Sequence, residues 1–364
     1  MPRDRNAKIE ALRIAAMLGI VAHHYAIHGG VIGGTESGNT AVFLAVFSSF
    51  GKWGVDVFVL VSAWFMVDRP ARGKALSRVY SETLPVSWLI GTLMAVTGVV
   101  ALSSRDVAKA VAPVVFSEYW FVTAFVLLVL ISPYLTIVID ALTKQQLGRL
   151  LAGGLVLWSV LTLVPGIALG MSDLAWFAFL YLIAGYLKRH GLPWTPRVLA
   201  VTALVSVGVL VLGVALAASW RVAIGSPADV WWVMTELASQ SSLLTAVPAI
   251  AVVAWATTSR PWRSPLIVTV ASASFGVYLI HDNPLIRRVL WSDVVDTTGA
   301  AGQAWLPLHA VGWSLAIYVA CTALVLALQP VCIRPMHRVT ERLRAAVTNT
   351  WGSGEASTKA PDRR

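Results

Sequence analysis

The stretch LRIAAMLGIVAHHYAIHGG, residues 12–30, decides the fold. It is apolar enough to cross a membrane, yet it carries Arg13, His23 and His24. An ionisable side chain in hydrocarbon costs about 2.5 to 3.5 kcal/mol on insertion scales, so such residues indicate a function. On a helix, Arg13 and His24 are about three turns apart and share one face, whereas His23 points about 100° away. One face therefore carries a cation near one end and an imidazole about 16 Å deeper.

The composition of the whole chain agrees with a membrane span at this place. Of its 364 residues, 57% are hydrophobic and only 13% are charged, against about 25% charged in soluble domains. Apolar segments long enough to span a bilayer recur throughout the chain. We therefore predict an all-α polytopic membrane protein of about ten transmembrane helices, at about 9–29, 41–67, 83–102, 119–139, 147–165, 174–187, 198–219, 241–257, 265–282 and 308–329.

The loops between these segments alternate in charge. Of the 28 lysines and arginines, 21 fall in one set of loops and the two chain ends, and five in the other set. Because positive charge marks the cytoplasmic side, both termini are predicted to be cytoplasmic. This topology explains the net charge of +10 better than a nucleic-acid surface does. The two cysteines, Cys321 and Cys332, have no spacing typical of a disulfide or a metal site.

The second segment contributes a possible partner for His24. Lys52 and Asp56 lie four residues apart on one helix face, and Asp56 falls within about a turn of the depth of His24. A carboxylate there could orient the imidazole and stabilise its protonated form. Alternatively, Lys52 and Asp56 pair with each other, and the histidines only form hydrogen bonds between helices. The interruption SSFGKWGVD, residues 48–56, also predicts a bend or break in this helix.

These residues resemble the membrane acyltransferase-3 family, whose members O-acylate sugars of bacterial surface polysaccharides. The resemblance starts with Arg13 and His24 separated by ten residues, and it covers about residues 7–335. One departure is Ala63, which follows Ser62 where many members have glycine. Four further stretches follow in the family's order: GVDVFVLVSAWF (54–65), EYWFVTAFVLLVLISPYL (118–135), FLYLIAGYL (179–187) and SFGVYLIHDNP (274–284).

The resemblance implies roles for particular residues. His24 is the catalytic histidine, which Asp56 would orient, and Arg13 with the RPAR motif (Arg69, Arg72) handles acyl-CoA. Arg78 lies in the same basic loop, and arginine binds phosphate well. The alternative is that this loop is basic only because it is cytoplasmic.

An acceptor site is expected at the outer face. Glu118, Tyr119 and Trp120 open the fourth segment there, and His281 closes the ninth. All four could line the site, or they could serve as interfacial anchors. No metal ion is expected, because the His24 and His28 pair has no acidic third ligand on its own helix.

The predicted domains are an acyltransferase-3-like transmembrane domain over residues 1–335 and a basic cytoplasmic tail over 336–364 that is disordered at its end. The implied function is that of a bacterial, multi-pass plasma-membrane O-acyltransferase with His24 as general base. Its donor is acyl-CoA, in the simplest case acetyl-CoA, and its acceptor is a hydroxyl of a surface glycan or lipid-linked sugar. A transporter of a polar glycoconjugate or anion is the alternative, although no internal repeat supports it. A scaffold within polysaccharide-synthesis machinery would not explain the face shared by Arg13 and His24.

Overall fold

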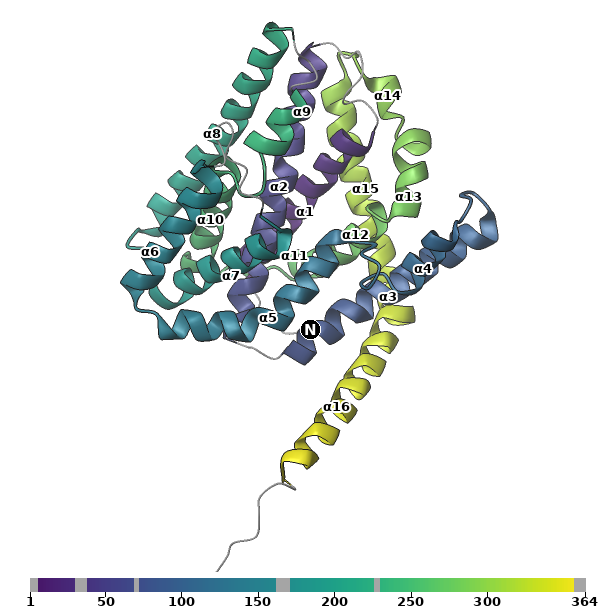
Figure 1. Ribbon diagram of the computed structural model, residues 1–364. Coiled ribbons are helices and arrows are strands. Elements are labelled where there is room, and N and C mark those ends of the chain that lie inside the picture. The colour runs from purple at the N-terminus through teal and green to yellow at the C-terminus, as the bar shows by residue number, and fades with distance from the viewer. Residues whose placement is uncertain (1–5, 30–37, 69–71, 162–170, 226–229, 357–364) are drawn as a thin grey trace, which may run out of the picture.

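The computed structural model describes residues 6–29, 38–68, 72–161, 171–225 and 230–356. Within these ranges every regular element is a helix, as predicted (Figure 1). The longer helices are α1 (Ala7–His28), α2 (Gly38–Met66), α3 (Arg72–Thr97), α5 (Trp120–Ala141), α7 (Asp173–His190), α8 (Pro196–Ala223), α10 (Leu243–Thr258), α15 (Leu306–Leu328) and α16 (Arg334–Ala356). The shorter ones are α4 (Ser104–Val111), α6 (Lys144–Leu155), α9 (Val230–Trp232), α11 (Pro265–Ser272), α12 (Ser274–His281), α13 (Pro284–Val289), α14 (Thr297–Ala300) and the π-helical turns η1 (Val156–Val160), η4 (Val233–Leu237), η5 (Leu290–Val294) and η6 (Gln329–Ile333).

Each predicted apolar segment falls on helices of the structure over most of its described residues. The third segment extends past the end of α3 at Thr97, and the fifth continues beyond residue 161, outside the described residues. Local signals explain several helix starts: Thr195 accepts a hydrogen bond from the Val198 amide just before Pro196, and Ser264 caps α11 in the same way. By length and hydropathy, four described helices could each cross a membrane, and one bent pair would make a fifth. Helix α1 is not among them, since it carries Arg13 and three histidines.

Helix α2 is continuous, so the predicted break at residues 48–56 is wrong. Its glycines serve instead to bring α2 against α1. A Cβ atom on Gly54 would collide with the carbonyl oxygen of Ala16, and one on Gly51 would collide with the ring of His23. On the other side, a Cβ on Gly19 would lie 2.6 Å from the carbonyl oxygen of Phe50. The two backbones therefore approach closely at small residues, as helices in membranes commonly do.

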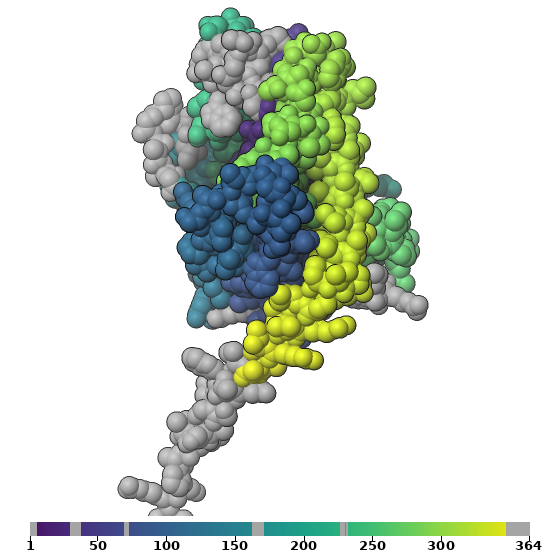
Figure 2. Space-filling view, turned by 90° about the vertical axis from the view of Figure 1, so that its right-hand side faces the viewer, coloured from purple at the N-terminus to yellow at the C-terminus, as the bar shows by residue number. Residues whose placement is uncertain are grey.

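Helix α3 begins at Arg72, about eleven residues before the third predicted segment. The basic stretch predicted as a cytoplasmic loop is therefore mostly the first turns of a helix. Helix α16 packs beside these turns, where Ser77 and Thr340 share a hydrogen bond of 2.7 Å between their hydroxyls. Beyond them α16 leaves the bundle (Figure 1), and Figure 2 shows it running past the blue surface of α3 and α4. Much of the predicted tail is thus helical, up to Ala356.

The ninth predicted segment is divided into α11 and α12 and then turns sharply. Its axis bends by 61° between the α11–α12 pair and the helical stretch that begins at Pro284. Asn283 caps the new helix by accepting a hydrogen bond of 2.9 Å from the Leu285 amide. Because proline at the first position of a helix needs no amide hydrogen bond, the sequence Asn283-Pro284 favours a helix start here. The bend leaves Asp282 between two helices, where it faces α1.

We predict the following result for the topology, which rests on the 21-to-5 division of loop charges. In a chain with Cys321 and Cys332 replaced by serine, Gln303→Cys should react in intact cells with a thiol reagent that does not cross membranes. The matched change Gln145→Cys should react only after the cells are opened. Both glutamines are exposed. The opposite labelling pattern would contradict cytoplasmic termini.

Candidate active site

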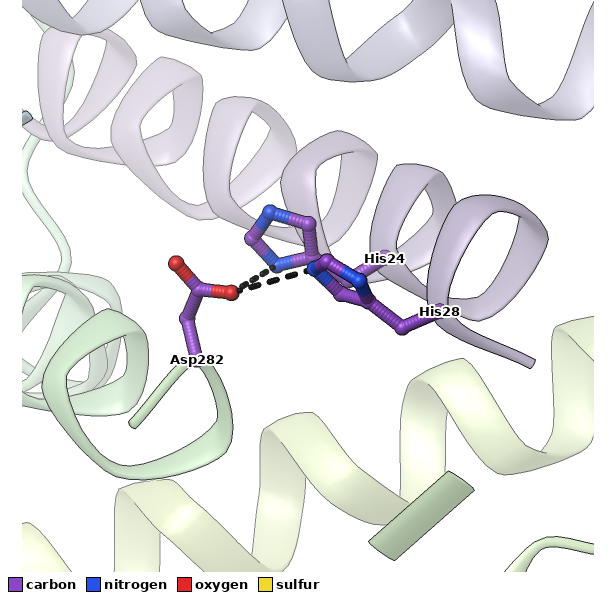
Figure 3. Close-up of side chains that lie close together, drawn as sticks. All are labelled: His24, His28 and Asp282. Carbon is purple, nitrogen blue, oxygen red and sulfur yellow. Dashed lines mark ion pairs between the residues drawn. The ribbon is translucent and has the colours of Figure 1, made fainter. Parts of the chain in front are cut away.

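His24 lies at the centre of a buried polar cluster between α1 and the end of α12. Its side chain is buried, and its Nδ1 atom lies 2.9 Å from Nε2 of His281 and 3.4 Å from Oδ1 of Asp282. Figure 3 shows His24 and His28 on α1 with their rings directed at the carboxylate of Asp282. The same Asp282 oxygen lies 3.5 Å from Nε2 of His28. Two histidines one helical turn apart thus share one carboxylate.

The hydrogen bonds around His281 assign the protons on both rings. Nδ1 of His281 lies 2.6 Å from the carbonyl oxygen of Val277, which can only accept, so this nitrogen carries the proton. A neutral His281 then has a bare Nε2, which accepts the Nδ1 proton of His24. A neutral His24 is therefore unprotonated at Nε2. That lone pair has no hydrogen-bond partner among the described residues, and His24 lines a cavity.

Arg287 completes this cluster from α13. Its Nε atom donates a hydrogen bond of 3.0 Å to the backbone oxygen of Asp282 and lies 3.3 Å from the Oδ1 atom of the same residue. Its Nη1 atom is 3.4 Å from Nε2 of His28. Asp282 is therefore the carboxylate that balances both the guanidinium and a protonated histidine. A charge buried in this way needs such partners.

Asp56 does not make the predicted contact with His24. It is fully buried on α2, and its Oδ1 atom accepts a hydrogen bond of 2.9 Å from the Trp176 indole of α7. The alternative prediction is that Lys52 and Asp56 pair with each other. Among the described residues the two charges attract each other without forming an ion pair within 4.0 Å, and Lys52 lies 5.9 Å from the ring centre of Trp120. The carboxylate within reach of His24 is Asp282.

The predicted acceptor residues divide into two groups. Glu118 and Tyr119 are buried supports of the bend: Asn283 donates hydrogen bonds of 3.2 Å to Glu118 and 2.7 Å to the Tyr119 hydroxyl. Trp120 alone of the three lines the cavity of His24. His281 lies behind His24 as its hydrogen-bond partner. The four predicted acceptor residues thus lie close to the site, but three of them support other residues and only Trp120 lines the cavity.

The cavity at His24 has a volume of about 230 Å³. It is enclosed by helices α1, α2, α5, α12 and α13, and its polar lining is largely basic. Only Asp282 carries a negative charge there among the described residues. Besides His24, the polar and aromatic residues of its lining are His23, His28, Lys52, Phe58, Trp120, Phe121, Phe275, Tyr278, Asp282 and Arg287.

A second cavity of about 230 Å³ lies on the side of Arg13. Arg13 and Arg78 both line it, and three phenylalanines, Phe58, Phe121 and Phe275, line both this cavity and that of His24. Arg13 is paired with Glu10 at 3.1 Å. Two cavities that share three side chains are adjacent, and the three shared phenylalanine rings lie between them.

A third cavity, of about 350 Å³, adjoins the second and shares Arg78 with it. Arg334 and His337 of α16 line its other wall. Arg78 lies 3.7 Å from Glu82 and its side chain is 54% exposed, so it remains accessible to an anionic ligand. Of the two other predicted acyl-CoA residues, Arg69 lies outside the described residues, and Arg72 begins α3.

Two groups of charges outside the spans fix the bundle at either end. At the α4 end, hydrogen bonds from Arg288 and from the Ser103 backbone hold the pKa of the Asp106 carboxyl at about 2. At the α7 end, Lys188 and Arg189 lower the pKa of Asp68, with Lys188 only 2.7 Å from the carboxylate. The first pair joins α4 to α13, and so holds the helix that carries Arg287.

Three ligand atoms, from His24, His28 and Asp282, lie within 4.8 Å of one another and could by distance hold a metal ion. The guanidinium of Arg287 contacts the same Asp282 oxygen. A fixed positive charge on that oxygen opposes a divalent cation. The arrangement fits a hydrogen-bonded catalytic cluster better than a metal centre.

Sequence reasoning missed Asp282 and Arg287. The signal available was the pair His281-Asp282 at the end of an apolar segment, directly before Asn283-Pro284. Comparison with known proteins adds one positive finding. A protein-family model described as an acyltransferase domain matches residues 6–329. A search of curated proteins finds no match, and neither does a search of solved structures.

Proposed function

This chain belongs to the acyltransferase-3 family and is an acyltransferase, and we propose that it O-acylates a glycan with His24 as the general base. The observation that carries the proposal is the bare Nε2 atom of His24 in a cavity, with Nδ1 fixed by His281 and Asp282. A neutral imidazole with an unprotonated nitrogen can take a proton from a hydroxyl during attack. The donor is an acyl-CoA, in the simplest case acetyl-CoA.

The proposed reaction has two proton transfers and one exchange of bonds. The acceptor hydroxyl oxygen bonds to the thioester carbonyl carbon while Nε2 of His24 takes the hydroxyl proton. The tetrahedral intermediate collapses, its carbon–sulfur bond breaks, and the thiolate takes the proton back from His24. The products are the ester and free coenzyme A. Asp282 lies beside Nδ1 and stabilises the imidazolium formed between these steps.

The route of the donor follows the three adjoining cavities. Arg78, Arg334 and His337 line the third cavity, and Arg13 lines the second with Arg78. Arginines bind phosphates through several charge-assisted hydrogen bonds, so the nucleotide end of coenzyme A would stay there. The thin pantetheine arm would pass the phenylalanines shared by the two inner cavities and bring the thioester to His24.

The acceptor would reach His24 from the opposite side. His28 and Arg287 are partly exposed, with 23% and 29% of their side-chain surface accessible, and they mark that mouth of the cavity. The predicted topology assigns this end to the outer face of a bacterial plasma membrane. A surface glycan or a lipid-linked sugar on that face would then receive an acyl group supplied from the cytoplasm.

One experiment distinguishes this proposal from a transporter. Purified protein in liposomes is supplied with radiolabelled acetyl-CoA on one side and a water-soluble glycoside on the other. We expect the label to be recovered as a glycoside ester with the wild-type protein, and not in liposomes that lack the protein. Movement of an unmodified glycoside or anion across the membrane, with no ester formed, would support the transporter instead.

We predict that Arg78→Gln with Arg334→Gln weakens binding of coenzyme A. Each lost charge-assisted hydrogen bond removes about 1.5 to 3 kcal/mol, so the loss of two should raise the dissociation constant by roughly a hundredfold or more. Pantetheine, which lacks the phosphates, should bind equally to both proteins. The matched control is Arg197→Gln, an exposed arginine in the first turn of α8. Unchanged coenzyme A binding by the double variant would mean that these residues are basic for topology alone. The same binding measurement on Arg69→Gln with Arg72→Gln tests the other two predicted arginines.

A further inference from the structure

Lys52 is a cation without a matching anion in the cavity of His24. It lies on α2 near the middle of the bundle and lines the cavity. Among the described residues its ammonium makes no hydrogen bond and no ion pair within 4.0 Å. Asp173 and Asp56, neither of which lines this cavity, attract it from a longer distance, and its ammonium lies 5.9 Å from the centre of the Trp120 ring. Asp56, one turn further along α2, is engaged by Trp176 instead. A lysine inside a membrane protein usually has a partner or a function.

Arg287 brings a second positive charge to the same cavity. Its Nε and Nη1 atoms face Asp282 and His28. Its Nη2 atom has no hydrogen-bond partner among the described residues, which leaves two N–H groups for a ligand. The two cations, Lys52 and Arg287, therefore face the single carboxylate of Asp282, and the histidines add no negative charge. Counted over its lining residues alone, the cavity carries one excess positive charge.

From this imbalance we infer that the acceptor carries an anionic group close to the hydroxyl that is acylated, and that Lys52 binds that group. The anion is a carboxylate or a phosphate. A sugar acid would supply the first, and a sugar linked to a lipid phosphate would supply the second. An anion in a cavity of low dielectric constant is attracted far more strongly than in water. This inference rests on the proposed function, since it names the substrate class of the same site.

The walls of the cavity fit a sugar that carries such a group. Trp120 and Tyr278 present aromatic surface, and Lys52 lies close to the Trp120 ring. A pyranose ring against the indole would hold its anionic substituent near the Lys52 ammonium. Its neighbouring hydroxyl would then face His24, which lines the same cavity. Charge therefore selects the acceptor and orients it at once.

The test compares three glycosides of similar size with the full-length protein in detergent or liposomes. They are p-nitrophenyl β-D-glucuronide, p-nitrophenyl β-D-glucoside and α-D-glucose 1-phosphate. Binding is measured by calorimetry without a donor, and acetyl transfer is measured separately with acetyl-CoA. We expect the wild type to bind at least one anionic probe roughly tenfold more tightly than the neutral glucoside. The probe that binds tighter identifies the carboxylate or the phosphate as the preferred group.

Lys52→Met should remove this preference, whereas Lys52→Arg should keep most of it. The control is Lys109→Met, because Lys109 lies on α4, outside the cavity. This variant should bind the probes like the wild type. Equal affinity for charged and neutral probes in the wild type would overturn the inference, as would an unchanged preference in Lys52→Met. An equal loss of kcat for all acceptors in Lys52→Met would overturn it too, because Lys52 would then act on the thioester. Anion binding through Lys52 without any acetyl transfer would leave the inference standing and refute the proposed function.

Discussion

Replacing His24 with alanine is expected to lower acyl transfer by about a hundred- to ten-thousandfold, the range typical for loss of a general base. The reason is the proton network: His281 and Asp282 engage Nδ1 of His24, so Nε2 remains for the acceptor hydroxyl. Coenzyme A binding should persist, because the arginines of the donor cavities do not contact His24. The measurement is acetyl transfer by the purified variant, together with a binding isotherm for the donor.

His23→Ala is the matched control for this prediction. His23 lies on the same turn of α1 and lines the same cavity, but its Nδ1 atom is 2.8 Å from the backbone oxygen of Ser48 on α2. Its ring therefore joins two helices, and its loss should lower thermal stability more than activity. An active His24→Ala enzyme, or an inactive but folded His23→Ala enzyme, would refute the assignment of the base.

The helices could be predicted from the sequence because they depend on local pattern, and the assignment of His24 as the base is a prediction from the same kind of pattern. Apolar length predicts where helices run, and the periodicity of α1 separates the face of His24 from that of His23. The continuity of α2 was not predictable in this way, since glycine reads equally as a break or as a site of close contact. Only the position of α1 against Gly51 and Gly54 decides between them.

The carboxylate that lies beside His24 could not be predicted from the sequence, and the reason is physical. Depth along a helix can be counted from sequence, and by that count Asp56 is a reasonable neighbour of His24. Which carboxylate touches the imidazole depends instead on the rotation of each helix and on the 61° bend beside which Asp282 lies. Packing among many helices sets the rotation and the bend of each one. The hydrophobic periodicity of the sequence therefore does not predict either of them. For the same reason, the sequence did not predict that Glu118 and Tyr119 support the bend instead of lining the cavity.

Matched substitutions can distinguish the roles of the Asp282 and Asp56 carboxylates. We expect Asp282→Asn to lower kcat by roughly a hundred- to thousandfold. Opposite charges about 4 Å apart attract by about 4 kcal/mol at the effective dielectric constant of partly buried sites, and each 1.4 kcal/mol in a barrier is a factor of ten. Asparagine keeps the shape of the side chain but removes the negative charge at 3.4 Å from His24. The imidazolium would then form beside the uncompensated Arg287 guanidinium, which contacts the same position at 3.3 Å.

Asp56→Asn should change kcat by less than about tenfold, because its amide oxygen can still accept the hydrogen bond from Trp176. Its effect should be on stability, through the buried Oδ2 position that has no hydrogen-bond partner among the described residues. Both variants are measured for kcat at saturating acetyl-CoA and for thermal unfolding. If Asp56→Asn loses more activity than Asp282→Asn while remaining as stable as the wild type, the carboxylate of α2 acts on His24 after all. If only Asp282→Asn loses activity, and it is as stable as the wild type, then the carboxylate at the bend after α12 is the group that supports His24 as a base.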